Sequence, residues 1–281
     1  MPTSPQTPKS PEAHDSQQPQ LYLIDSHAHL EYPQFDEDRD DMLDRARDAG
    51  VRTILAIGGA AGPDHLASAI PYAEAHDWIY ASSGIHPHEA PLANDSHFAK
   101  LAEIFEHPRI IACGEIGLDY HYPNTDRNAQ QKVFRRQMAM AASAQLPVVI
   151  HCRDAWSDCL EMLQSDWQPP QAGGIFHCFS GLLDEAKKGI ELGFYISFAA
   201  NITYTKSQNL RDIAAALPLD RMLIETDSPY LPPQDKRGKR NEPAYVAEVA
   251  RTIASVRDLD PTVVASQTAA NFKNLFKLDQ N

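Results

Sequence analysis

Six residues of the kinds that bind metal ions stand at or near the ends of short apolar runs in this chain of 281 residues. They are His27, His29, Glu115, His151, His177 and Asp227. A single histidine is more often an ordinary core or surface residue than a metal ligand. Six candidate ligands at equivalent places along the chain are a much stronger signal. Imidazole and carboxylate groups together predict a site for divalent metal ions.

The spacing of these residues indicates two ions rather than one. His27 and His29 are two residues apart, so on extended backbone both imidazoles point to the same side and suit one ion. His151 and His177 follow successive apolar runs and suit a second ion. The two carboxylates then bridge the ions or balance their charge, as in a metal-dependent hydrolase. Histidine ligands suit Zn or Mn, whereas Mg prefers oxygen, so the choice among Mg, Mn and Zn stays open.

The elements that must position these residues are short β-branched runs that alternate with longer helix-like segments. The expected strands are 21–25, 52–57, 79–84, 110–115, 147–151, 174–178, 193–198 and 221–226. The clearest expected helices are 38–49, 128–145, 207–216, 242–257 and 261–276, of which the last two are expected to complete an outer ring. Apolar strands separated by helices imply a parallel sheet that is covered on both faces.

Eight such units in about 205 residues fit a single α/β domain with the (β/α)8 TIM-barrel fold. An open doubly wound sheet is the alternative, and it would need a glycine-rich GxGxxG loop after the first strand. The segment 26–29 (SHAH) stands there instead, which favours the barrel. In a parallel barrel the carboxyl ends of all strands meet at the face where active sites lie. The six candidate ligands are therefore expected to converge.

The composition limits where the protein works and what it contacts. Residues 1–20 contain five prolines and many Ser, Thr and Gln residues, which predicts a disordered extension before a barrel domain over 21–281. That segment has no apolar core typical of a secretory signal, and no run approaches the roughly 20 apolar residues of a membrane span. The four cysteines form no CxxC pair, and scattered thiols fit a reducing compartment, so we expect a cytoplasmic protein. A monomer is favoured.

The formal net charge of −13 argues against broad electrostatic binding of nucleic acid. A metal site and a few cationic side chains can still reverse the field locally. Arg153, two residues after His151, is a candidate phosphate ligand, and an ion pair with Asp154 is the equally weighted alternative. His86 is a second candidate for substrate binding, against the alternative of a loop clamp stiffened by Pro87.

A third candidate for substrate binding is Arg240, in the most basic run of the chain, 236–240 (KRGKR). A charge run is usually a solvated surface. This one follows the last expected strand and so falls on a loop of the active face, where basic residues position a nucleic-acid backbone without reading its bases.

The chain also resembles a known family, the TatD family of metal-dependent deoxyribonucleases, whose members have amidohydrolase-like barrels. The resemblance runs from about residue 21 to residue 277. The segments that carry it are 23–30 (LIDSHAHL), 84–88 (GIHPH), 114–120 (GEIGLDY), 147–155 (PVVIHCRDA), 177–181 (HCFSG), 225–229 (ETDSP), 237–241 (RGKRN) and 271–276 (NFKNLF). One departure is Glu31, where the family usually has Asp or Asn.

The resemblance implies two metal sites that share Glu115. The first would be held by His27, His29, Glu115 and Asp227, and the second by Glu115, His151 and His177. Glu115 would bridge, and Asp227 would add the role of general base. The implied reaction is hydrolysis of DNA phosphodiester bonds by metal-activated water, as an exonuclease on single-stranded DNA, with RNA also possible.

Other functions fit the same six residues. One is hydrolysis of a carboxylic ester, such as deacylation of a D-aminoacyl-tRNA. Another is hydrolysis of a small amide or lactone, although relatives that use a carboxylated lysine need it where Glu115 stands. A binding module with a structural metal is disfavoured, because structural zinc sites are closed whereas this ligand set leaves room for water.

Overall fold

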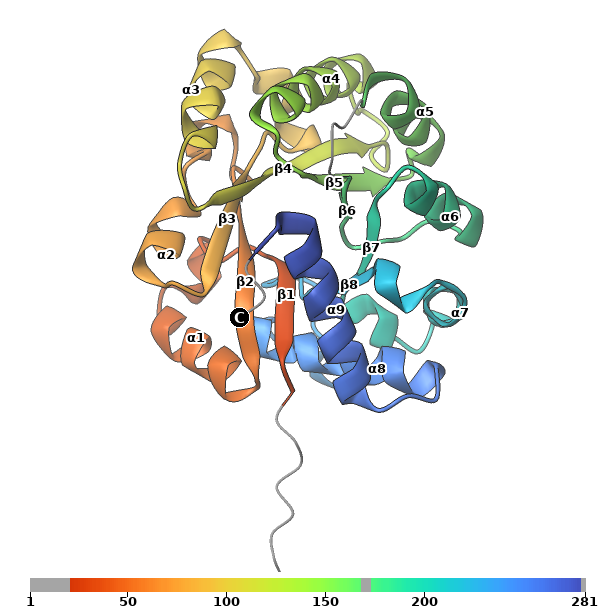
Figure 1. Cartoon of the computed structure of the whole chain (residues 1–281). Coiled ribbons are helices and arrows are strands. Elements are labelled where there is room, and N and C mark those ends of the chain that lie inside the picture. Colours follow the sequence, from red (N-terminus) through yellow and green to blue (C-terminus); the bar gives the residue numbers. More distant parts are fainter. Residues whose placement is uncertain (1–20, 168–172, 279–281) are drawn as a thin grey trace, which may run out of the picture.

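The computed structural model describes residues 21–167 and 173–278. The predicted disordered extension, residues 1–20, lies outside the described residues. Eight parallel strands pair in chain order and form the barrel that the sequence predicts (Figure 1). They are β1 Leu23–Ala28, β2 Val51–Gly58, β3 Ile79–Ser83, β4 Ile110–Asp119, β5 Val148–Arg153, β6 Gly174–Phe176, β7 Tyr195–Phe198 and β8 Met222–Ile224.

The barrel closes next to the expected site. Residues Ala28 and Ser228 form a parallel bridge between the end of β1 and the segment after β8. The backbone N–H of His29 donates to the carbonyl of Ser228 (2.8 Å), and that of Asp227 donates to the carbonyl of His27 (2.9 Å). The first and last candidate ligands are thereby held together by main-chain hydrogen bonds.

Helices surround the barrel between the strands. They are α1 Arg39–Asp48, α2 Ile70–Ala75, α3 Asp95–Phe105, α4 Arg127–Ala144, α5 Trp156–Asp166, α6 Leu183–Glu191, α7 Gln208–Ala216, α8 Val246–Val256 and α9 Pro261–Phe276. Among the described residues, no helix has the length and apolar character needed to cross a membrane.

The last helix departs from the sequence prediction. Helix α9 was expected in the outer ring, but Phe272 and Leu275 pack with Ile24, Leu55 and other side chains of the barrel interior. Figure 1 shows α9 lying in front of the strands, and it contacts both β1 and β8. Its buried face is apolar enough to close the amino-terminal end of the barrel, so α9 acts as a plug opposite the expected site.

Strand alternation explains how the core and the site share the same strands. In β5, Val149 belongs to the interior cluster, whereas Val148, Ile150 and Cys152 belong to the outer layer that packs against the helices. Because side chains alternate along a strand, His151 continues the inward series that Val149 begins. The interior is therefore apolar at its base and carries polar ligands at its carboxyl end.

The expected ends of three ligand-bearing strands were too early. Strand β1 runs through His27 to Ala28, β4 continues past Glu115 to Asp119, and β5 continues past His151 to Arg153. The β4–β5 register shifts between Cys113 and Ile116. Gly117 permits the extension, since it has φ 142° and a Cβ there would lie 2.0 Å from the carbonyl oxygen of His151. Glu115 accordingly lies within its strand rather than at its end.

Candidate metal centre

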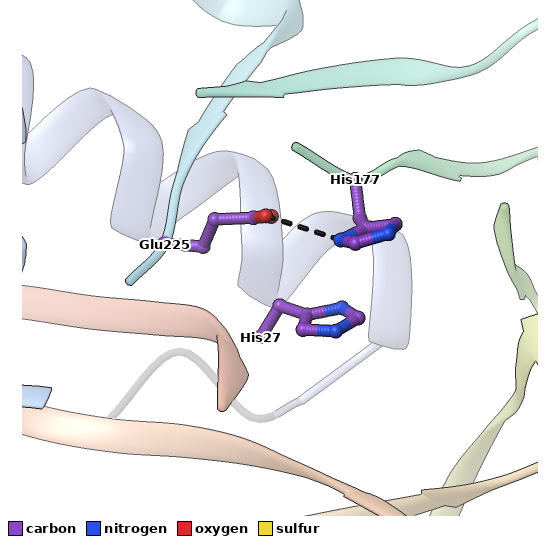
Figure 2. A group of neighbouring side chains, drawn as sticks. All are labelled: His27, His177 and Glu225. Atoms are coloured by element: carbon purple, nitrogen blue, oxygen red, sulfur yellow. Dashed lines mark hydrogen bonds and ion pairs between the residues drawn. The ribbon is translucent and has the colours of Figure 1, made fainter. Parts of the chain in front are cut away.

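The structure brings the six predicted ligands together at the carboxyl-end face of the barrel. Strands β1, β4 and β5 carry three of them, and the segments after β1, β6 and β8 carry the other three. The rings of His27 and His177 lie stacked at the middle, with centroids 3.9 Å apart and an interplanar angle of 13° (Figure 2). Residues from opposite ends of the chain therefore form one compact group.

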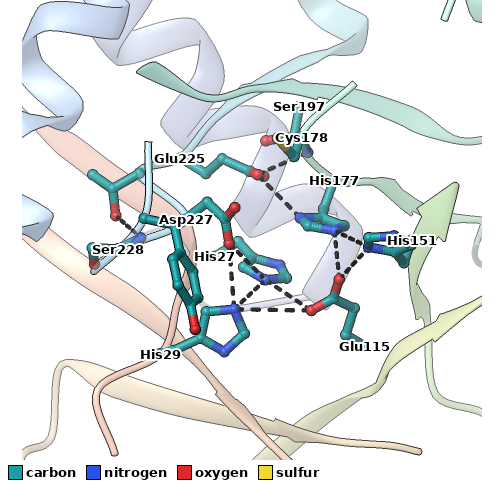
Figure 3. A network of polar contacts seen from close by, with 12 residues as sticks. His27, His29, Glu115, His151, His177, Cys178, Ser197, Glu225, Asp227 and Ser228 are labelled. Atoms are coloured by element: carbon teal, nitrogen blue, oxygen red, sulfur yellow. Dashed lines mark hydrogen bonds and ion pairs between the residues drawn. The ribbon is translucent and has the colours of Figure 1, made fainter. Parts of the chain in front are cut away.

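The first set of facing atoms comes from His27, His29, Glu115 and Asp227 (Figure 3). The Nε2 atoms of the two histidines are 3.3 Å apart. Oε2 of Glu115 lies 3.3 Å from Nε2 of His27 and 3.9 Å from that of His29. Oδ1 of Asp227 lies 3.7 and 3.3 Å from the same two nitrogens. Two imidazoles and two carboxylates thus point at a common centre.

The second set uses the other oxygen of the same glutamate. Oε1 of Glu115 lies 2.7 Å from Nδ1 of His151 and 2.7 Å from Nε2 of His177. These two nitrogens are 3.2 Å apart. Nε2 of His86 is 3.5 Å from the same oxygen. Glu115 therefore presents one oxygen to each set, which is the geometry that a bridging carboxylate requires.

The buried polar atoms of this centre have too few partners within the protein. Among the residues described, Nδ1 of His27, Nδ1 of His29 and both carboxylate oxygens of Glu31 are buried without a hydrogen-bond partner. Where Nε2 of His27 faces Nε2 of His29, only one of the two can carry a proton and donate it. Convergent nitrogen lone pairs and carboxylate oxygens fit divalent metal ions, which take both kinds of ligand.

The electrostatics of the centre favour charged carboxylates. Burial alone would raise the pKa of Glu115, but the facing imidazoles of His177, His86 and His27 hold it well below its usual range. Burial alone would also raise the pKa of Asp227, but the hydrogen bond from His29 and the charges of the neighbouring imidazoles together lower that pKa. Both groups are therefore anionic at neutral pH and available to a cation.

Two acidic residues that the sequence analysis missed hold the outer nitrogens of the second set. Oδ2 of Asp119 lies 3.0 Å from Nε2 of His151, and Oε1 of Glu225 lies 3.3 Å from Nδ1 of His177. Each carboxylate accepts a hydrogen bond from the outer ring N–H, which leaves a lone pair on the inner nitrogen and orients the histidine as a ligand. The sequence could have indicated both residues. Each is an acidic residue inside an otherwise apolar strand or directly after one, and a charged side chain is rarely buried there unless it is paired.

Glu225 also lies close to the first set. One ring nitrogen of His27, one of His177 and a carboxylate oxygen of Glu225 all fall within 4.8 Å of one another (Figure 2). The carboxylate is fixed by the backbone N–H of Cys178, which donates to Oε1 at 2.7 Å. Its Oε2 atom is buried without a partner among the described residues. Glu225 therefore underlies the place where the two sets meet.

A cavity of about 610 Å³ opens over the centre. Two of the three predicted substrate residues, His86 and Arg153, line it together with Tyr32, Tyr122 and Tyr230. Burial lowers the pKa of His86 to about 4, so its imidazole is neutral at physiological pH. A neutral imidazole donates or accepts one hydrogen bond without adding charge.

The ion pair between Arg153 and Asp154, which was the alternative to phosphate binding, is not formed. Asp154 instead lies 2.8 Å from Nδ1 of His121, and the Arg153 guanidinium lies 5.8 Å from the ring centroid of Tyr122. Arg153 therefore faces the cavity without a carboxylate partner among the ion pairs found in residues 21–167 and 173–278.

Arg240 is not brought into the cavity. Its guanidinium donates to both oxygens of Asp38, at 2.6 and 2.8 Å, and to the carbonyl of Gln34 at 2.7 Å. These contacts satisfy most of its donors and draw it toward the loop after β1. Two other basic residues of its run are also engaged, since Lys236 pairs with Asp235 and Arg237 lies over the ring of Tyr204.

Known proteins are similar to this chain over most of its length. The model of the "TatD related DNase" family matches residues 24–277. The metal-dependent hydrolase YabD of Bacillus subtilis is 37% identical over 257 residues, which cover 92% of this chain and all of that protein. A "3'-5' ssDNA/RNA exonuclease TatD" of Erwinia tasmaniensis is 34% identical and covers 91% of this chain and 100% of its own length. The crystal structure of YJJV, a TatD homologue of Escherichia coli, superposes with a TM-score of 0.85 at 30% identity, over 92% of this chain and 99% of that one.

Proposed function

Because the chain belongs to the TatD-related DNase family, whose matched relatives include metal-dependent hydrolases, we propose that it is a 3'–5' exonuclease on single-stranded DNA, with RNA as a second substrate. The observation that carries the proposal is the placement of Glu115. Its two carboxylate oxygens face separate sets of ligands, at 3.3 Å from Nε2 of His27 and at 2.7 Å from Nδ1 of His151. This division supports two divalent ions bridged by one residue.

We assign the ligands accordingly. His27, His29 and Asp227 would hold the first ion with Glu115, and His151 and His177 would hold the second with the same glutamate. When bound, a pair of divalent ions lowers the pKa of a water molecule and neutralises charge that develops on a phosphodiester. The histidine-rich set supports Zn or Mn, and the assay below compares these ions with Mg.

The chain's own residues supply the rest of the chemistry. Asp227 is ionised and lines the cavity, so its carboxylate can accept the proton that water loses on attack. Arg153 offers a planar guanidinium to the phosphate oxygens from the same cavity wall as His151. His86, which is neutral, can hydrogen-bond a substrate oxygen beside Glu115.

The decisive experiment uses a single-stranded oligonucleotide with a 5' label. Protein freed of metal by EDTA is incubated with it in Mg, Mn or Zn, beside the variant Glu115→Ala. The matched control is Glu103→Ala, because the Glu103 side chain is 68% exposed on α3 and pairs only with Lys100. We expect a ladder of products shortened from the 3' end, abolished by EDTA and by Glu115→Ala but kept by the control.

The opposite result redirects the proposal. If the wild type cleaves no strand with any of the three metals, the nuclease assignment is wrong. Hydrolysis of a D-aminoacyl-tRNA, or of a simple lactone, under the same conditions would then identify an ester or amide hydrolase with the same metal centre. Cytoplasmic location and a monomeric state stay predictions; cell fractionation and light scattering test them.

A further inference from the structure

Two tyrosines form an aromatic wall of the cavity next to the first set of ligands. The ring centroids of Tyr32 and Tyr230 are 5.6 Å apart with an interplanar angle of 76°. The ring of His29 lies 5.2 Å from Tyr32 and 6.2 Å from Tyr230. Neither tyrosine is needed to hold a metal ion. Because both rings lie beside the candidate metal ligand His29, they are placed to contact the substrate.

Tyr230 keeps an uncovered ring surface. It is 46% exposed and lines the cavity. Its contacts with Tyr32 and His29 are edge-on, with interplanar angles of 76° and 73°. Within residues 21–167 and 173–278, no aromatic ring stacks face-on against it and no cation lies over it. One face is therefore available to a planar ligand.

The backbone under this ring is firmly held. The N–H of Tyr230 donates to the carbonyl of Asp227 at 2.9 Å. Its own carbonyl accepts from Nδ2 of Asn241 at 2.6 Å, and the same amide nitrogen donates to the carbonyl of Thr226 at 2.8 Å. Asn241 is fully buried. The backbone that carries the ring is thereby fixed relative to Asp227, and a preorganised surface costs less ordering entropy on binding.

Tyr122, on the opposite wall, is a poorer surface for a ligand. Although it is 52% exposed, the Arg153 guanidinium lies over it at 5.8 Å. The rings of His88 and His121 contact it at 5.4 and 5.2 Å. Its neighbours are one cationic side chain and two imidazoles, which suits contact with a phosphate more than with a base.

We propose that Tyr230, braced by Tyr32, is a stacking platform for the nucleobase of one of the two nucleotides that flank the scissile phosphodiester. The inference rests on the proposed function, because the phosphodiester must lie at Glu115 for its neighbour to reach Tyr230. Every base has a π-face, so such a platform accepts all sequences. A base stacked between its neighbours in a duplex cannot present that face, so the platform favours a frayed or single strand.

The test compares strands that carry an abasic residue at the 3'-terminal or the penultimate position with the intact strand. In the wild type we expect an abasic residue at one of these positions to raise KM by roughly 5- to 100-fold, the loss typical of one base stacked on an aromatic ring. In Tyr230→Leu the intact and abasic strands should show nearly equal KM. Tyr230→Phe should keep the wild-type ratio, because stacking needs the ring and not the hydroxyl.

The matched control is Tyr22→Leu, since Tyr22 is 40% exposed but lies outside the cavity, with Lys273 over its ring. It should keep the wild-type abasic penalty. Thermal melting of each variant verifies that it is folded. An equal abasic penalty in the wild type and in Tyr230→Leu overturns the platform, as does a Tyr230→Phe variant that behaves like Tyr230→Leu.

A binding measurement separates this inference from the proposed function. A strand with 2-aminopurine at the sensitive position and an uncleavable methylphosphonate at the terminal linkage is titrated with protein. Stacking on Tyr230 should change the 2-aminopurine fluorescence with the wild type and with Tyr230→Phe but not with Tyr230→Leu. If the wild type cleaves no strand yet the fluorescence responds in this way, the nuclease assignment fails and Tyr230 still stacks a base, but not beside a scissile linkage. If cleavage occurs and the fluorescence response is the same in all variants, only the platform fails.

Discussion

Replacing Asp119 with asparagine tests how the proposed second ion would be held. Burial alone would raise the pKa of Asp119, but hydrogen bonds from His151 and His88 keep it well below its usual range, so the group is a carboxylate at neutral pH. Oδ2 faces Nε2 of His151 at 3.0 Å and Nε2 of His88 at 2.9 Å, and Oδ1 accepts from the N–H of His121 at 2.9 Å. Asparagine is nearly isosteric and removes the charge.

The size of the effect follows from these contacts. Asparagine has one acceptor oxygen where three donors converge on Asp119. Whichever way its amide turns, an NH₂ group faces at least one donor. A buried hydrogen bond to a charged group contributes about 1.5–3 kcal/mol, and outer partners of histidine ligands change metal affinity by roughly 10- to 100-fold. We therefore expect the second ion to bind Asp119→Asn about 10- to 100-fold more weakly, with the first ion much less affected.

Isothermal titration of EDTA-treated protein with Zn or Mn measures both ions directly. Asp154→Asn is the matched control, because the Asp154 side chain is 64% exposed and contacts only the imidazole of His121. It should bind both ions with affinities within about twofold of the wild type, as exposed ion pairs contribute little. Wild-type affinity for both ions in a folded Asp119→Asn variant would refute the reasoning that this carboxylate orients His151.

Three further predictions concern stability. Gln137→Leu removes the buried amide that pairs with the N–H and carbonyl of Ile85 (2.7 and 3.0 Å), and should lower the free energy of unfolding by about 2–4 kcal/mol in urea denaturation. Phe176→Ala opens a cavity at a fully buried side chain and should cost about 3–5 kcal/mol by the same measurement. Hydrogen bonds from Arg240 and Arg45 lower the pKa of Asp38 below its usual value of 3.8. The interactions of the Asp38 carboxylate with these arginines therefore stabilise the fold above that pH, and this stabilisation is lost as the pH falls. Asp38→Asn should therefore be less stable than the wild type by about 1 kcal/mol or less at pH 7, and a difference that does not shrink in denaturation at successively lower pH would contradict the assignment.

The sequence predicted the barrel and the convergence of the six ligands for a simple physical reason. Parallel strands buried on both faces are apolar throughout, so a histidine or carboxylate at or near the carboxyl end of a strand is conspicuous. The order of the strands then follows from the short helical connections. Neither inference requires knowledge of contacts between distant residues.

The features that escaped prediction all depend on such contacts. Arg240 was assigned to substrate because it lies in a basic run, but its partner Asp38 is 202 positions away. Helix α9 has an apolar face like the other helices. Phe272 packs against the barrel interior because that face fills the amino-terminal end of the barrel, which the sequence of the helix alone does not indicate. Asp119 was read as part of a motif, although its partners His88 and His151 come from two other strand ends.

These long-range contacts also resolve the conflict between an acidic chain and a polyanionic substrate. The net charge of −13 describes the average surface, and three of the four cations in the basic run 236–240 are engaged, with Asp235, Asp38 and the ring of Tyr204. What lines the cavity is a cluster of imidazoles and carboxylates together with Arg153. Cations bound by that cluster would place positive charge only where the scissile phosphate must lie. Affinity would then depend on the metal centre and on aromatic contacts more than on the outer surface, which suits an enzyme that takes one strand end at a time.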